Sequence, residues 1–391
     1  MKKPIVLIAP GVGLFLIGTL MLVALTGFRL PPSDEAEARI ASTNGPRALP
    51  ALVTAPRLDQ IPAVTAAALS VPDVAGLAEV KSGTRWLAGW NAEGSPQAVP
   101  PAGYLIPVDV GAVDPAQYRT VIPEPLHDML SQLSTGGAVL SRTGAALRGI
   151  TDKGHLQFPG ASIPVVGVVD DVFLRNHEVL VSLGTGAALG LHNTEYMVIA
   201  LNRLEAGKQV EEAVRAAIPP GTSLRVRGPE GSGASSGLSP LLSLGQIKAH
   251  FGEFPAIHGA GSGIRIEQSW IDANTEMATL PILGTFRCHK KLVPQMRAAF
   301  AEVEAAGLSG LIRPGDFGGC FSPRFIRSGN DAGLSRHAWG AAFDFNVSTN
   351  LYGQVPSMDR RLVEIMERHG FSWGGHWNYP DGMHFEFVAA P

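Results

Sequence analysis

Short apolar runs bounded by Gly, Asp or Asn recur in the middle of the chain. Four of them are rich in Val and Ile, which is typical of β-strands: residues 105–113, 165–169, 179–183 and 196–201. Between them, residues 125–133 and 210–218 place apolar side chains at helical spacing. The alternation predicts a small α+β domain over residues 75–227, in which no pattern indicates catalytic chemistry.

Two segments lack this periodicity and separate the predicted domains. Residues 29–74 are rich in Pro and Ala, which predicts an extended linker. The segment GPEGSGASSGLSP, residues 228–240, predicts a second, flexible linker. The C-terminal domain therefore covers residues 241–391. Within it, residues 292–306 present one apolar helical face that Gly307 ends.

A long apolar run opens the chain. Residues 4–28 contain no charged residue, and Lys2 and Lys3 precede them. Because about 20 apolar residues cross the hydrocarbon core of a membrane, residues 1–28 are predicted to be a transmembrane signal anchor. The positive-inside bias places the N-terminus in the cytoplasm and the later domains outside, as in a single-pass protein of the cell membrane. A cleaved signal peptide is the alternative, and it would make the protein secreted.

Composition and cysteine content narrow the class of protein. The 391 residues suffice for two modest domains besides the membrane segment, and the formal net charge of -3 gives no electrostatic reason to expect a nucleic-acid partner. In an oxidising compartment Cys288 and Cys320 favour a disulfide bond. Two buried free thiols remain an alternative. Thiolate ligation of zinc is disfavoured because no C-x-x-C spacing is present.

Two segments of the C-terminal domain carry candidate chemistry. The segment GLSRHAWGAAFDFN contains His337 and Asp344, and the segment WGGHWNYPDGMHFEFV contains Asp381 and His384. Imidazole nitrogen and carboxylate oxygen both bind zinc, and three protein ligands plus a water are typical of a catalytic site. We therefore predict one Zn²⁺ per chain, held by His337, Asp344 and His384. Asp381, three residues before His384, could take a proton from the water and pass it to the leaving amine.

A second carboxylate accompanies the last histidine. Glu386 lies two residues after His384 and shares its strand face by the period of two. We expect it to orient the second ring nitrogen of His384, as carboxylates around metal sites commonly do. The alternative is a solvated strand glutamate.

The two segments together match a known motif pair. The pattern S-x-H-x-x-G-x-A-x-D is met by Ser335, His337, Gly340, Ala342 and Asp344, and the pattern D-x-x-H by Asp381 and His384. Over about residues 265–391 the chain resembles the zinc D-alanyl-D-alanine carboxypeptidases and L-alanyl-D-glutamate endopeptidases, a group that includes VanY-type enzymes. The resemblance implies that the two histidines and Asp344 bind zinc and that Asp381 is the general base. We expect an α+β peptidase domain with a small antiparallel sheet and flanking helices.

The same family uses an arginine upstream of the first histidine. Arg324 and Arg327 are the candidates, and Arg324 is favoured by its place after Cys-x-x-Pro. A guanidinium can grip a carboxylate by two parallel hydrogen bonds, which suits a peptide C-terminus. We also expect Ser335, Arg327 and Trp377 to contact the substrate. His376 departs from the family, in which an aspartate is common at that place. It could alter the specificity pocket or supply an additional metal ligand.

These features predict a hydrolase of the cell wall. We expect zinc-dependent hydrolysis of peptidoglycan stem peptides, with D-Ala-D-Ala carboxypeptidase action first and endopeptidase action on an internal stem bond as an alternative. Another alternative is a non-catalytic cell-wall-binding or scaffold protein. A third is that residues 75–227 recruit a membrane-protein partner. Because no H-E-x-x-H occurs, zinc chemistry on a helix of that type is excluded.

Overall fold

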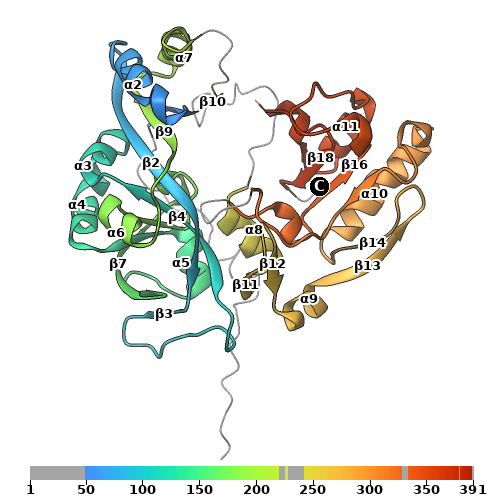
Figure 1. Cartoon of the computed structure of the whole chain (residues 1–391), viewed down its shortest axis with the longest axis horizontal. Helices are drawn as coiled ribbons and strands as arrows, with labels where there is room; N and C mark the ends of the chain where they lie inside the picture. The colour runs from blue at the N-terminus through green and yellow to red at the C-terminus, as the bar shows by residue number, and fades with distance from the viewer. Residues whose placement is uncertain (1–48, 220–224, 228–241, 328–332, 378, 390–391) are drawn as a thin grey trace, which may run out of the picture.

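The computed structural model describes residues 49–389, apart from 220–224, 228–241, 328–332 and 378. These residues form two lobes that lie side by side, residues 49–227 and residues 242–389 (Figure 1). The predicted signal anchor and the linker at 228–240 lie outside the described residues. Within the described ranges, no helix combines the length and apolar character needed to cross a membrane.

The first lobe is built on a ten-stranded mixed sheet. Its neighbouring strands pair antiparallel except for two parallel pairs, β4–β8 and β5–β7. In spatial order the strands are β10 (Arg225–Arg227), β1 (Ala51–Ala55), β9 (Thr194–Leu201), β2 (Val74–Leu87), β4 (Ile106–Val113), β8 (Val179–Ser182), β5 (Ala138–Ser141), β7 (Ala161–Val169), β6 (Gly154–Phe158) and β3 (Gly89–Ala92). The four strands predicted from apolar runs correspond to β4, β7, β8 and β9.

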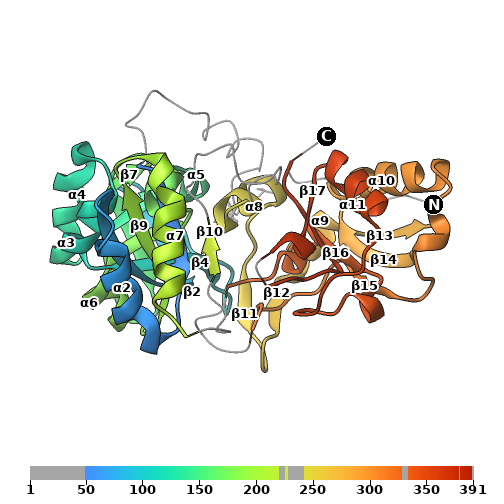
Figure 2. The same ribbon diagram turned by 90° about the horizontal axis from the view of Figure 1, so that it is seen from above.

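Short helices cover this sheet. They are α2 (Ile61–Leu69), α3 (Pro115–Tyr118), α4 (His127–Ser131), α5 (Arg142–Arg148), α6 (Leu183–Ala188) and α7 (Gly207–Ala216). The predicted helices at 125–133 and 210–218 correspond to α4 and α7. Figure 2 shows α2 and α7 next to each other on one side of the sheet, where they bury a separate apolar cluster.

The first lobe begins earlier than the sequence predicted, because the linker was placed at residues 29–74. The structure forms β1 and α2 within that range, so the prediction of a linker up to residue 74 was wrong. Leu52 of β1 and Val64 of α2 are buried against Ile199 of β9. Small apolar residues pack closely between a strand and a helix, so a composition typical of linkers concealed two core elements.

The C-terminal lobe contains the small antiparallel sheets and helices that were predicted for it. Its pairs β11–β12 and β13–β14 and its four-stranded sheet β15-β16-β18-β17 are all antiparallel. The elements in chain order are α8 (Leu244–Phe251), β11 (Ala256–His258), β12 (Ile264–Ile266), α9 (Gln268–Asn274), β13 (Thr275–Leu280), β14 (Gly284–His289), α10 (Val293–Ala305), β15 (Phe317–Gly319), β16 (Ala342–Phe345), α11 (Arg360–Arg368), β17 (Phe371–Trp373) and β18 (His384–Phe387). The positive φ of Gly307 follows α10 as predicted.

Helix α8 lies between the two lobes in both ribbon views (Figures 1 and 2). Beside it, Arg148 and Glu178 of the first lobe meet Lys248 and Glu253 of the C-terminal lobe. The four N–O distances are 3.1 Å for Arg148–Glu178, 3.0 Å for Arg148–Glu253, 2.7 Å for Lys248–Glu178 and 3.0 Å for Lys248–Glu253. All four side chains are shielded from solvent. We call these residues the buried charge cluster, and they join the lobes by direct contact.

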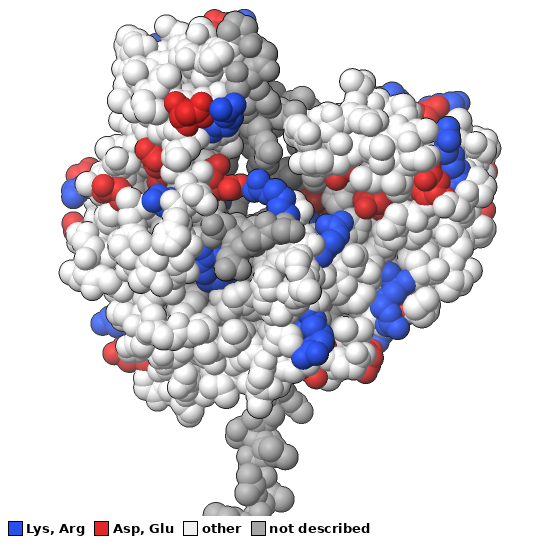
Figure 3. Space-filling view, viewed as in Figure 1, with Lys and Arg blue, Asp and Glu red and all other residues white. Residues whose placement is uncertain are grey.

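On the outer surface the charges are distributed differently. Figure 3 shows a depression between the two lobes, and Lys, Arg, Asp and Glu side chains that lie over this face in small groups of mixed sign. The four side chains of the buried charge cluster, by contrast, are shielded from solvent.

Candidate metal centre

Two neighbouring strands bring the first pair of candidate ligands together. In the antiparallel pair β16–β18, Asp344 lies directly opposite His384. Directly opposed residues project to the same face of a sheet, so both side chains lie on one side. On the other face Phe343 and Phe385 stack with ring centroids 5.7 Å apart, inside the aromatic core of the lobe. The alternating pattern of β16 thus separates the polar site from the core.

The third candidate ligand comes from a short helical turn. His337 lies in the 3₁₀-helix Arg336–Ala338, and the hydroxyl of Ser335 caps this turn by accepting a hydrogen bond from the His337 backbone N–H at 3.3 Å. His337, Asp344 and His384 are each buried and form a group that could hold a metal ion. Residues 47 positions apart in the sequence therefore meet at one point.

The distances within this group fit a tetrahedral ion. His337 Nε2 lies 3.3 Å from Asp344 Oδ2 and 3.3 Å from His384 Nδ1, and His384 Nδ1 lies 3.0 Å from Asp344 Oδ1. Ligand atoms at tetrahedral corners, with bonds of the usual zinc lengths, lie about 3.3 Å apart. The donor set of two imidazoles and one carboxylate also suits such an ion.

Both histidines have their outer nitrogens engaged elsewhere. His337 Nδ1 lies 2.9 Å from the carbonyl oxygen of Cys320, and His384 Nε2 lies 3.2 Å from a carboxylate oxygen of Glu386. With a cation bound at the centre, each acceptor would keep the ring proton on the outer nitrogen and leave His337 Nε2 and His384 Nδ1 as ligand atoms. Glu386 thus makes the contact that was expected of it, and it is buried rather than solvated.

The charges of the group reinforce this arrangement. Burial alone would raise the pKa of Asp344, but hydrogen bonds from His337 and His384 lower it well below its usual range. Burial opposes protonation of His384, yet the hydrogen bonds to Asp344 and Glu386 outweigh it and raise its pKa to about 10. The site therefore favours positive charge, whether it comes from a proton or from a cation.

Asp381 lies in the turn that leads into β18. Its backbone N–H donates to the carbonyl of Gly374 at 2.9 Å, and its own carbonyl accepts from the His384 N–H at 3.1 Å. A side chain at Gly374 would approach the Asp381 carbonyl oxygen to 2.6 Å, so this close contact requires glycine. Burial raises the pKa of Asp381, and its Oδ1 is buried without a hydrogen-bond partner among the described residues.

Of the residues expected to act on the substrate, Trp377 contacts the centre and Arg324 acts on it through its charge. Trp377 has its ring centroid 5.3 Å from that of His384, and its indole N–H is buried and has no partner in the described part of the chain. The charge of Arg324 lowers the pKa of Asp381, against the larger opposing effect of burial, which places its guanidinium in the electrostatic field of the site. Both residues are thus available to a ligand.

Three other candidates are engaged elsewhere. Arg327 is exposed and pairs with Glu195 of the first lobe at 3.2 Å. Ser335 is buried and serves as the helix cap described above. His376 pairs with Glu367 at 3.1 Å rather than joining the metal-binding group. The substrate contacts expected of Arg327 and Ser335 stay predictions beside these contacts within the protein.

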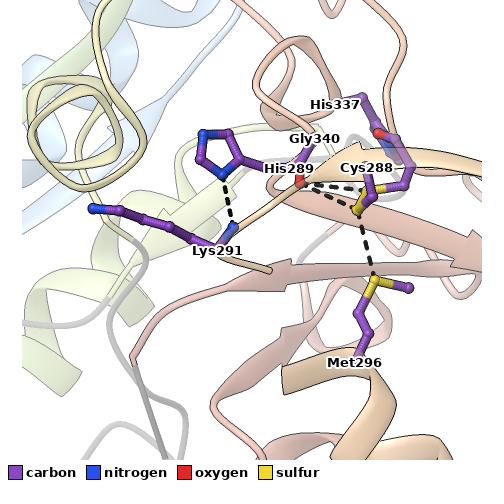
Figure 4. The surroundings of a disulfide bond; sticks show 7 residues. Cys288, His289, Lys291, Met296, His337 and Gly340 are labelled. Atoms are coloured by element: carbon purple, nitrogen blue, oxygen red, sulfur yellow. Dashed lines mark hydrogen bonds between the residues drawn. A yellow bond between two sulfur atoms is a disulfide. The ribbon is translucent and has the colours of Figure 1, made fainter. Parts of the chain in front are cut away.

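Cys288 and Cys320 are joined by the disulfide bond that the sequence favoured, so neither is a free thiol. Both sulfur atoms lie against the carbonyl oxygen of Gly340, at 3.4 and 3.3 Å, and Figure 4 shows His337 beside them. The disulfide restrains Cys320, whose carbonyl oxygen orients His337. It therefore supports one ligand of the metal centre.

Two supporting groups were missed by sequence reasoning. Arg336 lies 4.0 Å from Glu386 and donates to the carbonyl of Leu242 at 2.6 Å, which links the start of the lobe to the carboxylate behind His384. The second group is the backbone carbonyl of Cys320, which orients His337. Because every residue has a backbone carbonyl, residue type gives no indication of this contact. Arg336 directly precedes His337 in the motif, and this position was the one indication in the sequence that it lies near the site.

Replacement of Glu386 by Gln is expected to weaken metal binding. The amide keeps the shape of the side chain but removes the charge that holds the His384 proton outward. We expect the dissociation constant for Zn²⁺ to rise about 10- to 100-fold, as for other outer partners of metal ligands. Competition against a chromophoric chelator measures it, with the exposed Glu304→Gln as control. Equal affinities in the two variants would contradict the role given to Glu386.

Comparison with known proteins adds an independent finding. Residues 328–387 match a family model described as D-alanyl-D-alanine carboxypeptidase, and this match includes all three candidate ligands, Asp381 and Glu386. No curated protein matches the chain. The geometry of the centre and the family match coincide in the same segment. Residues 328–387 of this chain are therefore similar to the D-alanyl-D-alanine carboxypeptidase family, which supports a peptidase role for the C-terminal lobe.

Proposed function

We propose that the protein is a zinc-dependent hydrolase of peptidoglycan stem peptides. The observation that carries this proposal is the arrangement of Asp381 beside the buried group His337, Asp344 and His384. Asp381 is half-buried, and its Oδ1 has no hydrogen-bond partner among the described residues. Zinc bound by these three residues would act as a Lewis acid and lower the pKa of a water to about 7. A structural ion would have no use for a free carboxylate beside it.

The side chains of the site divide the remaining work. Asp381 accepts a proton from the attacking water and delivers it to the leaving amine, a task that its burial and raised pKa favour. Arg324 binds the terminal carboxylate of the peptide through parallel hydrogen bonds. Trp377 offers its unpaired indole N–H and its ring to the bound peptide.

The role of Arg324 favours cleavage next to a free carboxylate, which is carboxypeptidase action on a terminal D-Ala. Cleavage of an internal stem bond is the second candidate, because Arg324 could instead polarise the scissile carbonyl. We also propose that residues 1–28 tether the protein to the cell membrane with both lobes outside, where its substrate lies. In that position the first lobe could contact a membrane-protein partner.

Mass spectrometry of defined muropeptides incubated with the purified protein tests the proposal. We expect zinc-dependent loss of one terminal D-Ala from a pentapeptide stem, and its suppression by a chelator. A cut inside the stem would establish the endopeptidase instead. Intact muropeptides in the presence of one bound zinc per chain would contradict hydrolysis and favour a cell-wall-binding protein.

A further inference from the structure

The segment that carries Arg324 is held by backbone hydrogen bonds on both edges. We call residues 323–327 the arginine segment. On one edge Phe325 N–H donates to Ser262 O at 2.7 Å and Ile264 N–H to Pro323 O at 3.2 Å; on the other, Ser335 N–H donates to Arg324 O at 3.0 Å and Ile326 N–H to Gly333 O at 2.9 Å. The second edge belongs to the motif that carries His337. The position of Arg324 is therefore tied to the metal centre through the backbone.

The first lobe packs directly on this segment. Trp86, near the end of β2, lies with its ring centroid 6.2 Å from that of the buried Phe325 and 6.4 Å from that of His258. His258 in turn lies 5.4 Å from Phe325, so the three rings form one aromatic junction. Trp86 is part of the core packing of the C-terminal lobe, although it belongs to the sheet of the first lobe.

Two further contacts flank the aromatic junction. Leu105 of the first lobe exchanges backbone hydrogen bonds with Ala256 of β11 at 3.0 and 2.8 Å, and β11 pairs with β12, next to the arginine segment. At the other end of the segment, Arg327 pairs with Glu195 of β9 at 3.2 Å. The first lobe thus contacts the segment directly at Phe325 and Arg327, and it reaches the neighbouring strands β11 and β12 through Leu105.

Arg324 has no side-chain restraint among the residues that the structure describes. Within the described residues its guanidinium makes no hydrogen bond or ion pair, so its reach depends on where the backbone holds its Cα atom. Adjacent side chains of an extended segment point to opposite faces, and Phe325 takes the face toward Trp86. A displacement of about 1 Å in a group that positions a substrate can cost about 100-fold in rate. Packing at Phe325 therefore influences the position of the Arg324 guanidinium.

We propose that the first lobe is a positioning element of the peptidase site, in which Trp86 acts through Phe325 to hold Arg324 in place. The inference rests on the proposed function for its kinetic effect, but its structural part can be tested without substrate. It assigns residues 49–227 a task within the same molecule, independent of any membrane partner.

Hydrogen exchange measured by mass spectrometry on the full chain provides the substrate-independent test. In Trp86→Ala we expect faster exchange of the amides of Phe325 and Ile326 by about 10-fold or more, with that of β18 unchanged. Trp86→Phe keeps an edge-on ring and should restore protection, and it serves if the alanine variant does not fold. Phe173→Leu, a core aromatic of the first lobe, is the matched control and should leave the segment unchanged. Protection of the arginine segment equal to wild type in Trp86→Ala would overturn the proposal.

A double-mutant cycle gives the functional readout. Against a stem peptide with a free carboxylate, Trp86→Ala should raise KM about 10-fold, a coupling of the size found between contacting residues, with kcat changed far less. In the Arg324→Ala background the same change should add less than about 2-fold, because the group it positions is gone. Effects that multiply would contradict action through Arg324. Wild-type protein that hydrolyses no stem peptide, yet shows the expected exchange pattern, would contradict the proposed function and leave the positioning role standing.

Discussion

Asp381→Asn is expected to lose hydrolysis of stem peptides by about 10²- to 10⁴-fold while still binding one zinc ion per chain. Asparagine keeps the size of the side chain and the hydrogen bonds of the turn, since those are made by the backbone of residue 381. It cannot accept a proton, so the attacking water and the leaving amine lose their relay. The three candidate ligands are untouched, and the metal content should stay the same.

The measurement combines kcat on a pentapeptide stem with the zinc content of the dialysed protein. Asp272→Asn, an exposed carboxylate of α9 in the same lobe, is the control and should match wild type in both. If Asp381→Asn retained wild-type kcat, the assignment of the general base would be wrong. If it lost its zinc as well, Asp381 would belong to the ligand set.

Lys248→Met is expected to destabilise the folded protein by about 3–5 kcal/mol, the usual cost of removing one partner from a buried ion pair. Lys248 donates to Glu178, Glu253 and the carbonyl oxygen of Pro107, and none of these side chains is exposed to solvent. Methionine fills the volume but leaves two carboxylates to share Arg148. Their charge cannot be screened by water, so the folded state is penalised.

Urea unfolding followed by tryptophan fluorescence measures this loss as a lower midpoint concentration. Lys208→Met removes an exposed lysine that pairs with Glu212 at 3.8 Å, and it should change the free energy of unfolding by less than about 0.5 kcal/mol. Adding Glu178→Gln to Lys248→Met removes one of the stranded charges and should recover part of the loss. Equal midpoints for Lys248→Met and Lys208→Met would show that the buried charge cluster does not hold the lobes together.

The group of candidate metal ligands could be predicted from the sequence because its chemistry is carried by residue type and spacing. His337, Asp344 and His384 stand in two short motifs, and the alternating pattern around Asp344 also predicted its strand. The apolar runs of the first lobe located β4, β7, β8 and β9 for the same reason, since burial on a sheet demands Val, Ile and Leu. Local pattern was sufficient wherever the determining contacts were local.

The parts that could not be predicted depend on contacts between distant segments. The carbonyl oxygen of Cys320 orients His337, yet a backbone oxygen leaves no trace in residue type. The cap that Ser335 gives to a turn and the pairing of Arg327 with Glu195 across the lobes were likewise not visible in the sequence. The Ala-rich stretch that forms β1 and α2 is buried only because it packs against β9, which lies about 150 residues later in the chain.

The pairing of Asp344 with His384 also determines when the candidate ligands can meet during synthesis of the chain. Asp344 and His337 leave the ribosome some 40 residues before His384 and Glu386, and β16 alone offers an incomplete ligand set. A third ligand, and the carboxylate that sets its tautomer, arrive only with β18. The nascent chain therefore cannot bring the three candidate ligands together before nearly the whole domain has emerged.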